Sequence, residues 1–406
     1  MIRRVLVLAL VVALASVASA DVVWTWSGGG GTDVWETPAN WTAPAGNTYT
    51  YPTEQYYTDP NAGVEFVNKD VTDIIIDGGT VVKTDSTTAS NDLYLGGTDC
   101  FLKLQNSASL TVGDDMKIGR GDDGASTASR IDVLSGSTFH LNDDFTMADD
   151  SGSDCIVNVS GSSTFTVDAG FIGDEGDAEI NVTSALFECR NYVRVGYKSS
   201  GTVTVDGVGA ELKAGYSAHV GDGADTTGEL IIANGAEANV GTRLRIGGAS
   251  GSTTSGSTGT VTVSNGSTLR VGVRPDNTEE DLRVGYGLGS TGTLNVLSGS
   301  RVEAGTARTC NYGATGFWNV DGNSTVEVTG GIQLSQQAGS VSTVTVTDGS
   351  SFSSTGDRVY VGINGTTNMT VTDSTVASGT DFRVGYAATS VATLDISGTS
   401  VLNCGR

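Results

Sequence analysis

The stretch that decides the fold is TVTV at residues 202–205, because it recurs along the chain. Identical copies stand at 260–263 and 343–346, and looser ones at 293–296, 368–371 and 393–396. A turn rich in Gly, Ser, Asn and Asp leads to a second short apolar stretch, for example GSTF at 136–139. A third stretch closes on glycine, as in MKIG, VRVG, LRIG, LRVG and FRVG at 116–119, 193–196, 244–247, 282–285 and 382–385. Each repeat therefore predicts three strands.

The repeat length follows from the last apolar residue of the first strand, and successive copies are 23 to 33 residues apart. A period near 27 residues is too short for a propeller blade of about 40. It suits one coil of an all-β, right-handed parallel β-helix (β-solenoid) of about thirteen coils. The repeat anchors are Ile76, Leu104, Val133, Val159, Val182, Val205, Ile232, Val263, Val296, Val320, Val346, Val371 and Ile396.

Period-two alternation predicts which side chains face inward. Val203 and Val205 point to one side of the strand and Thr202 and Thr204 to the other. Stacked coils then form internal columns of Val, Ile and Leu, with polar residues outside, and each coil depends on its neighbours for burial. At a strand spacing of ~4.8 Å, thirteen coils make a rod about 60 Å long.

The N-terminus predicts export. Arg3 and Arg4 precede a nearly uninterrupted apolar run at 5–17, and ASA at 18–20 is typical of a cleavage site, so residues 1–20 read as a signal peptide. Loss of the two arginines changes the formal charge from −24 to −26. Such a charge disfavours nucleic acid and anionic membrane surfaces as partners. We expect a secreted or cell-surface protein without membrane insertion of the mature chain.

The cysteines and the longer connections carry no clear site. Five cysteines with no short spacing do not indicate a disulfide framework. Insertions at 248–259 and around 275–280 lengthen two coils, and we interpret them as variable loops, with ligand binding as the alternative.

Residues 21–70 differ from the repeats that follow at 71–406. Four of the five tryptophans of the chain lie here, namely Trp24, Trp26, Trp35 and Trp41. Large amphipathic rings suit an N-terminal cap over the open strand edges of the first coil. The alternative is an aromatic platform that stacks on sugar rings.

These residues carry a resemblance. WTWSG at 24–28, then Trp35 and NW at 40–41, ahead of repeats with an apolar-x-Val-x-x-Gly-Ser pattern, resemble the start of autotransporter-type β-solenoid passengers. They are also similar to exported bacterial solenoids with PEP-type C-terminal sorting signals. The resemblance implies export and a solenoid fold. The sequence has neither a barrel translocator nor a sorting motif, and it stops within a coil. We expect a fragment, with a natural terminus capped by a partner as the alternative.

No catalytic residue or cofactor is predicted. His140 and His219 lie 79 residues apart, on different coils and in different strands of the repeat. Acidic pairs in the turns, at 114–115, 122–123, 143–144, 149–150 and 174–175, are expected to be solvated corners, with weak Ca²⁺ binding as the alternative.

One outward position of the third strand is basic in several coils, at Lys117, Arg194, Arg245, Arg283 and Arg383. In three coils the closing glycine is followed by tyrosine, at Tyr197, Tyr286 and Tyr386. We expect Ala218, Gln333 and Tyr360 to interrupt this column. The cations either pair with acids of neighbouring turns or form a ligand stripe for anionic glycans.

These observations favour a structural or adhesive rod without catalytic activity, such as a stalk, matrix component or adhesin. Its partners would be extracellular glycans or other surface and matrix proteins. The alternative is a β-helix protein that binds or cleaves polysaccharide. Ice binding by the outward threonines is a remote alternative, since Glu229 and Ile231 interrupt them.

Overall fold

The computed structural model describes residues 22–26, 41–42, 55–57, 65–67, 72–77, 80–83, 93–96, 100–113, 115–120, 128–248, 256–272 and 281–405. Before residue 101, side chains are described only at Leu93 and Leu95. The signal peptide, Trp35, Asp114, the acidic pair at 122–123 and the loop at 275–280 lie outside the described residues.

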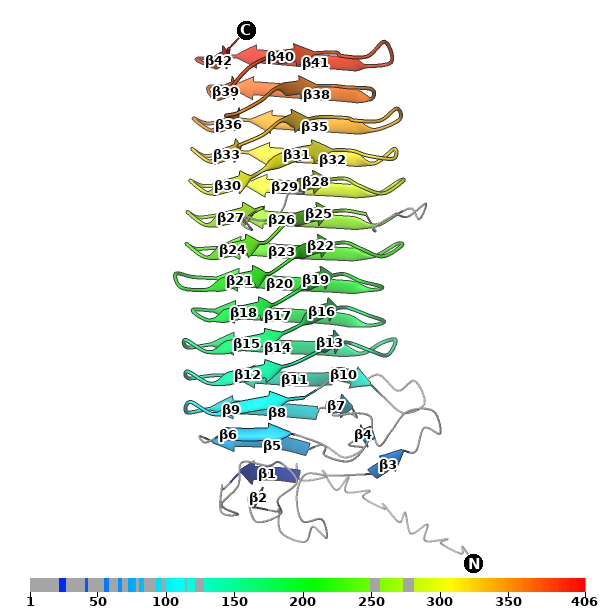
Figure 1. Cartoon of the computed structure of the whole chain (residues 1–406), viewed down its shortest axis with the longest axis vertical. Helices are drawn as coiled ribbons and strands as arrows, with labels where there is room; N and C mark the ends of the chain where they lie inside the picture. The colour runs from blue at the N-terminus through cyan, green and yellow to red at the C-terminus, as the bar shows by residue number, and fades with distance from the viewer. Residues whose placement is uncertain are drawn as a thin grey trace, which may run out of the picture.

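The described residues form a rod in which each coil adds one strand to each of three sheets (Figure 1). The first sheet has fifteen strands, and all of its neighbours pair in parallel except β1 and β2. Its members are β1 (Val22–Trp26), β2 (Trp41–Thr42), β5 (Thr72–Asp77), β8 (Cys100–Gln105), β11 (Ala128–Val133), β14 (Asp154–Ser160), β17 (Asp177–Thr183), β20 (Ser200–Asp206), β23 (Thr227–Ala233), β26 (Thr258–Val263), β29 (Thr291–Val296), β32 (Thr315–Val320), β35 (Val341–Val346), β38 (Thr366–Thr372) and β41 (Val391–Ser397).

The second sheet has thirteen parallel strands of four residues each. They are β6 (Thr80–Lys83), β9 (Ser109–Val112), β12 (Thr138–Leu141), β15 (Thr164–Val167), β18 (Leu186–Cys189), β21 (Glu211–Ala214), β24 (Glu237–Val240), β27 (Thr268–Val271), β30 (Arg301–Ala304), β33 (Thr325–Val328), β36 (Ser351–Ser354), β39 (Thr375–Ser378) and β42 (Val401–Cys404).

The third sheet has twelve parallel strands and carries the candidate site. They are β7 (Leu93–Gly96), β10 (Met116–Arg120), β13 (Asp144–Met147), β16 (Ala169–Ile172), β19 (Tyr192–Val195), β22 (Ser217–Val220), β25 (Arg243–Ile246), β28 (Asp281–Val284), β31 (Thr306–Thr309), β34 (Ile332–Gln333), β37 (Val359–Val361) and β40 (Phe382–Val384). A separate antiparallel pair, β3 (Gln55–Tyr57) and β4 (Glu65–Val67), lies near the N-terminus.

The register confirms the predicted parallel β-solenoid. Ile76 pairs with Leu104, Leu104 with Val133, and the same column runs through Val205 to Ile396. Every predicted anchor occupies it. Parallel in-register pairing stacks equivalent residues, so one repeat anchor becomes one internal column.

The core is a continuous apolar column between the three sheets. Phe139, Phe165 and Phe187 come from the second sheet, are fully buried, and stack with ring centroids 4.8 and 5.6 Å apart. Phe145 of β13 meets Phe165 edge to face at 5.1 Å. The contacting rings come from neighbouring coils, so no single repeat builds this core by itself.

A second column holds small residues where the chain turns from the third sheet into the next coil. Gly201, Gly228 and Gly259 are register neighbours at the start of the first strand, and Gly292 continues the column. A Cβ at Gly228 would lie 2.2 Å from the Gly221 nitrogen and 2.3 Å from the Val195 oxygen. Glycine here lets two backbones cross closely at these turns.

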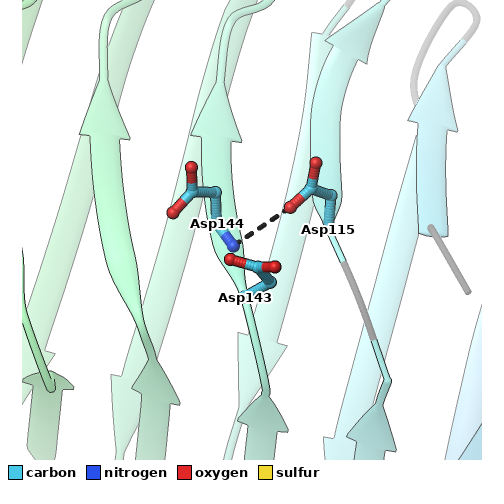
Figure 2. A group of neighbouring side chains, drawn as sticks. All are labelled: Asp115, Asp143 and Asp144. Carbon is cyan, nitrogen blue, oxygen red and sulfur yellow. Dashed lines mark hydrogen bonds between the residues drawn. The ribbon is translucent and has the colours of Figure 1, made fainter.

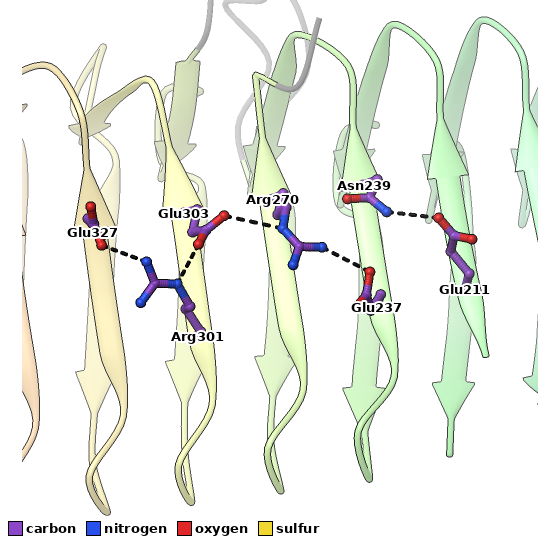
Figure 3. A network of polar contacts seen from close by, with 7 residues as sticks. All are labelled: Glu211, Glu237, Asn239, Arg270, Arg301, Glu303 and Glu327. Carbon is purple, nitrogen blue, oxygen red and sulfur yellow. Dashed lines mark hydrogen bonds and ion pairs between the residues drawn. The ribbon is translucent and has the colours of Figure 1, made fainter. Parts of the chain in front are cut away.

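The outward face of the second sheet carries paired charges (Figure 3). Arg270 lies between Glu237 and Glu303, with nitrogen-to-oxygen distances of 2.9 and 3.2 Å. Arg301 contacts Glu303 of its own strand and Glu327 of the next strand. These side chains are partly exposed, so each pair contributes at most about 1 kcal/mol. The acids and bases on this face satisfy one another.

The two ends of the rod differ. At the N-terminal end, β1 extends the first sheet beyond β5, and β2 pairs antiparallel with β1 through Trp26 and Trp41. At the C-terminal end, apolar side chains of the last described coil are exposed, among them Val391, Ile396 and Val401.

Four cysteines, Cys155, Cys189, Cys310 and Cys404, are free thiols. Among the described residues, no helix is long and apolar enough to cross a membrane.

Candidate functional site

The outward column of the third sheet is more continuous than the sequence analysis predicted. His219, not Ala218, pairs with Arg194 and Arg245, and Ala218 is buried inside the coil. The prediction was one residue out of register, and in a strand one residue moves a side chain to the opposite face. The column is Lys117, Thr146, Phe171, Arg194, His219, Arg245, Arg283, Arg308, Gln333, Tyr360 and Arg383.

Arg308 belongs to this column and was missed from the sequence. It pairs with Arg283 on one side and Gln333 on the other. Its strand reads TART and is followed by Cys310, so it lacks the closing glycine by which the basic third strands were recognised in the sequence. The strand pairing with the neighbouring coils places Arg308 in the column. Five consecutive coils, from β19 to β31, therefore carry Arg or His at this outward position.

Four of the five predicted cations have acidic partners. Lys117 Nζ lies 3.9 Å from Asp149, Arg194 lies 3.4 Å from Asp222 and Arg383 lies 2.7 Å from Asp381. Arg283 contacts Asp281, which also lies 3.5 Å from Arg308. These ion pairs agree with one of the two explanations of the column, in which the cations pair with acidic residues of neighbouring turns.

Arg245 is the exception. It is 7% exposed, and among the described residues no carboxylate forms an ion pair with it. Its guanidinium and that of Arg283 each lie 4.7 Å from the ring centre of Tyr286. Burial, followed by the charge of Arg243, lowers the pKa of Arg245. Among the described residues, the middle of the column therefore holds a buried guanidinium without an ion-pair partner, and the nearby charge of Asp222 only partly opposes the lowering of its pKa.

The other predicted tyrosines also contact arginine. Tyr197, Tyr192 and Phe171 surround Arg194, with ring centres 4.9, 5.2 and 5.7 Å from its guanidinium carbon. Tyr386 and Tyr360 both contact Arg383 and meet each other edge to face at 5.2 Å. Cation–π contacts hold these arginines against the surface.

His219 and Asp222 form a buried pair within the column. His219 Nδ1 lies 3.1 Å from Asp222 Oδ1. Burial lowers the pKa of His219, although the bond to Asp222 opposes this effect. Burial alone would raise the pKa of Asp222, but the hydrogen bond from His219 and the charges of Arg194 and Arg245 bring it below its ordinary value. At neutral pH the imidazole is uncharged and Asp222 is ionised.

A groove of about 690 Å³ lies beside the C-terminal half of this column. One wall is the strand column from Arg283 to Tyr360, and the other is formed by the turn residues that follow β28, β31, β34, β37 and β40. A tyrosine pair stands at each end. The lining residues are Arg283, Tyr286, Arg308, Asn311, Tyr312, Gln333, Gln336, Gln337, Tyr360, Ile363, Asn364 and Tyr386.

Hydrogen bonds fix the groove amides before any ligand arrives. Gln336 Nε2 donates to Gln333 Oε1 at 3.1 Å, and the Tyr312 amide donates to Gln337 Oε1 at 3.1 Å. Asn364 Nδ2 donates to the Gln336 carbonyl at 3.0 Å. Because these side chains are already ordered in the free protein, they lose less conformational entropy when a ligand binds.

The N-terminal part of the same face carries acidic side chains instead (Figure 2). Oxygens of Asp115, Asp143 and Asp144 lie within 4.8 Å of one another, and the Asp144 amide donates to Asp115 at 3.1 Å. Burial, then the charges of Asp115, Asp143 and Asp168, raise the pKa of Asp144 to about 6. This cluster unites two of the acidic turns noted in the sequence.

The remaining predicted sites are less informative. Lys198 Nζ lies 2.7 Å from Asp174, so that acidic turn carries its own counterion. Glu229 and Ile231 lie in register between the threonines of β20 and β26, as the sequence indicated, so the threonine face is interrupted there. Trp24, Trp26 and Trp41 lie on β1 and β2, and their side chains are outside the described part of the structure.

In comparisons with known proteins, no family model, curated protein or solved structure matches this chain.

Proposed function

We propose that this chain is an exported, non-enzymatic adhesive rod that binds an extracellular glycan in the groove between Arg283 and Tyr386. The observation that carries the proposal is the groove itself, which combines tyrosine rings with oriented side-chain amides. The signal peptide predicted at 1–20 supports an extracellular location. The resemblance to exported bacterial solenoids agrees with this role, and membership of those families remains a proposal.

The groove has the chemistry that sugars require. Tyr312 and Tyr386 are 50% and 58% exposed, so their rings are available to pack on the apolar faces of sugar rings. Gln and Asn side chains offer both donors and acceptors, which suits hydroxyl groups. Asn311 adds a buried Oδ1 without a hydrogen-bond partner among the described residues. A ligand hydroxyl is one donor that would satisfy it.

The length of the groove along the rod also suits a linear polymer. Its lining comes from five successive strands of the third sheet, which span about four strand spacings, or ~19 Å. Each coil presents its side chains one strand spacing from the next, which is close to the length of a pyranose unit. A linear polysaccharide lying along the rod would therefore meet equivalent positions with successive sugars.

Tyr312→Ala tests the proposal. We expect the purified mature protein to bind one or more members of a panel of soluble plant, algal and bacterial polysaccharides in pull-down and calorimetry. Tyr312→Ala should weaken that binding about fivefold, because one stacked ring contributes on the order of 1 kcal/mol. Tyr216→Ala is the matched control, since Tyr216 is 39% exposed and does not line the groove.

Binding to no member of the panel, or equal loss in both variants, would contradict the proposal. Because Tyr312 is half exposed and outside the core, its removal should leave the far-ultraviolet circular dichroism spectrum and the melting temperature unchanged. Loss of binding would then reflect the groove rather than unfolding.

The second candidate is cation-assisted cleavage of a polysaccharide at Asp115, Asp143 and Asp144. It is favoured by the three convergent carboxylates, since Ca²⁺ prefers oxygen ligands. The weak Ca²⁺ binding expected at the acidic turns would be located here. The same panel, incubated with and without millimolar CaCl₂, tests it. Ca²⁺-dependent release of short products that Asp143→Asn abolishes would favour this function over simple binding.

A further inference from the structure

The groove is depleted of acidic residues in a strongly acidic protein. The chain has 46 Asp and Glu against 22 Lys and Arg. Among the described residues that line the groove there are two arginines and no acid. The second sheet shows the contrasting arrangement, in which each arginine of the charge network has its carboxylates (Figure 3). Among the described residues, the lining of the groove therefore carries positive charge in a chain of net negative charge.

The charge imbalance extends beneath the groove. Strands β25, β28 and β31 carry four arginines, and Asp281 is the one acid in their sequences, RLRI, DLRV and TART. Asp281 is shared between Arg283 and Arg308. Arg245 is more than nine-tenths buried, and its Nε has no hydrogen-bond partner among the described residues. Among the described residues, Asp281 is therefore one carboxylate for the two guanidinium groups that line the groove.

We propose that the ligand of the groove is an acidic polysaccharide, whose carboxylate or sulfate groups lie over Arg283 and Arg308. This inference rests on the proposed function, because it names the class of glycan that the same groove would select. The tyrosine and amide groups contact the sugar rings and hydroxyls, and the arginines contact the charged substituents. The acidic polymer therefore binds at the β28 end through charge and toward β40 through stacking and hydrogen bonds.

The geometry of the arginines suits this task. Arg308 is 36% exposed at its side chain and is the more accessible of the two, while the Arg283 side chain is 13% exposed. Asp281 contacts both guanidinium groups and holds them at the wall of the groove. A guanidinium fixed on one edge still presents further N–H donors, which match the two oxygens of a carboxylate or the oxygens of a sulfate.

The negative charge of the rest of the rod does not prevent such binding. At 0.1 M salt, charges are screened over about 10 Å, so a bound polymer senses the groove and its nearest coils. The acidic cluster at Asp115 and Asp144 lies at β10 and β13, several coils from β28. Repulsion at that end would limit how far along the face a polymer extends.

The test uses pairs of polymers that share a backbone and differ in charge. We would titrate the mature protein with polygalacturonate and its methyl ester, with carboxymethyl-cellulose and hydroxyethyl-cellulose, and with dextran sulfate and dextran. We expect at least one acidic member to bind at least tenfold more tightly than its neutral partner. That preference should fall as NaCl rises from 50 to 500 mM.

Variants assign the preference to the groove. Arg308→Gln should lower affinity for the acidic polymer about tenfold and leave the neutral partner unchanged, since it removes a charge-assisted hydrogen bond. Arg301→Gln is the matched control, because Arg301 is similarly exposed at 43% but lies on the second sheet. It should change neither affinity.

The outcomes separate this inference from the proposed function. Equal binding of both members of every pair, without salt dependence, would overturn the acidic ligand and leave a glycan groove that Tyr312→Ala still disrupts. Absence of binding to every polymer would overturn both. Tighter binding of oligo(dT) than of any acidic polysaccharide would also overturn the inference, because the anionic ligand would then be a nucleic acid.

Discussion

Gly228→Ala should destabilise the rod because its new Cβ would meet a hydrogen bond of the adjoining corner. Gly228 lies at the start of β23 with an ordinary negative φ, so conformational strain is not the reason. Its Cβ would lie 2.2 Å from the Gly221 nitrogen and 2.3 Å from the Val195 oxygen. These two atoms are partners in a backbone hydrogen bond of 2.8 Å.

The magnitude follows from two terms. Overpacking against backbone costs about 1–3 kcal/mol, and a buried amide and carbonyl that lose each other cost about 1–3 kcal/mol more. Replacement of glycine by alanine reduces the entropy of the unfolded chain and offsets about 0.4–1 kcal/mol. We therefore expect a net loss of about 1–5.6 kcal/mol, with the damage centred on the β19, β22 and β23 corner.

Guanidinium denaturation followed by circular dichroism measures the loss, and hydrogen exchange with mass spectrometry locates it. The peptides that contain Gly221 and β22 should exchange faster in the variant than in the parent protein. The matched control is Gly331→Ala, where the nearest atom is the flexible Asp357 carboxylate at 3.3 Å and φ is also not positive. That change should be neutral or slightly stabilising. An unchanged or higher midpoint for Gly228→Ala would refute the reasoning.

Two further predictions concern the face and the core. Because the pKa of Asp144 is about 6 in the folded chain and 3.8 ordinarily, its contribution to stability is fully present below about pH 4 and is lost as pH rises through 6. The full shift would correspond to about 3 kcal/mol, and we expect about 1 kcal/mol at this partly solvated site. Asp144→Asn should therefore raise the melting temperature at pH 7.5 but not at pH 4, whereas Glu179→Gln, on the first sheet, should change neither; a gain independent of pH would contradict this. Phe165→Ala, which removes a fully buried ring in contact with Phe139 and Phe187, should cost about 3–5 kcal/mol in denaturation, and Phe165→Leu less than half as much. Equal effects of the two substitutions would show that the cavity is not the cause.

The fold could be predicted from the sequence because successive coils repeat the same pattern of three short apolar strands. The alternation in β20 and β26 indicates which side chains face inward, and parallel pairing places Val205, Ile232 and Val263 in one column. The prediction of the cation column was less complete, since it depended on a glycine-ended motif. Arg308 lacks that ending and was missed, and His219 was placed one position out.

The groove could not be predicted from the repeat. Its amides lie largely in turns, where the sequences of successive coils differ and no periodic pattern marks them; of its tyrosines, Tyr286 and Tyr386 follow a closing glycine and were noted in the sequence. Gln336, Asn311 and Tyr286 become neighbours because their coils stack, and the hydrogen bond between Tyr312 and Gln337 joins two such turns. The sequence signal for the groove as a whole was that these successive turns contain no acidic residue, although the chain is acidic.

By itself the sequence determined the coil: three strands, a period near 27 residues, and columns of Val, Ile and Leu facing inward. Burial enforces that pattern, because each strand must place alternate apolar side chains against its neighbours. Only the tertiary structure decided which outward charges are satisfied. Arg283 and Arg308 share Asp281, while Arg245 finds no carboxylate partner among the described residues. Such pairing depends on side-chain distances between stacked coils, which no spacing along the chain specifies.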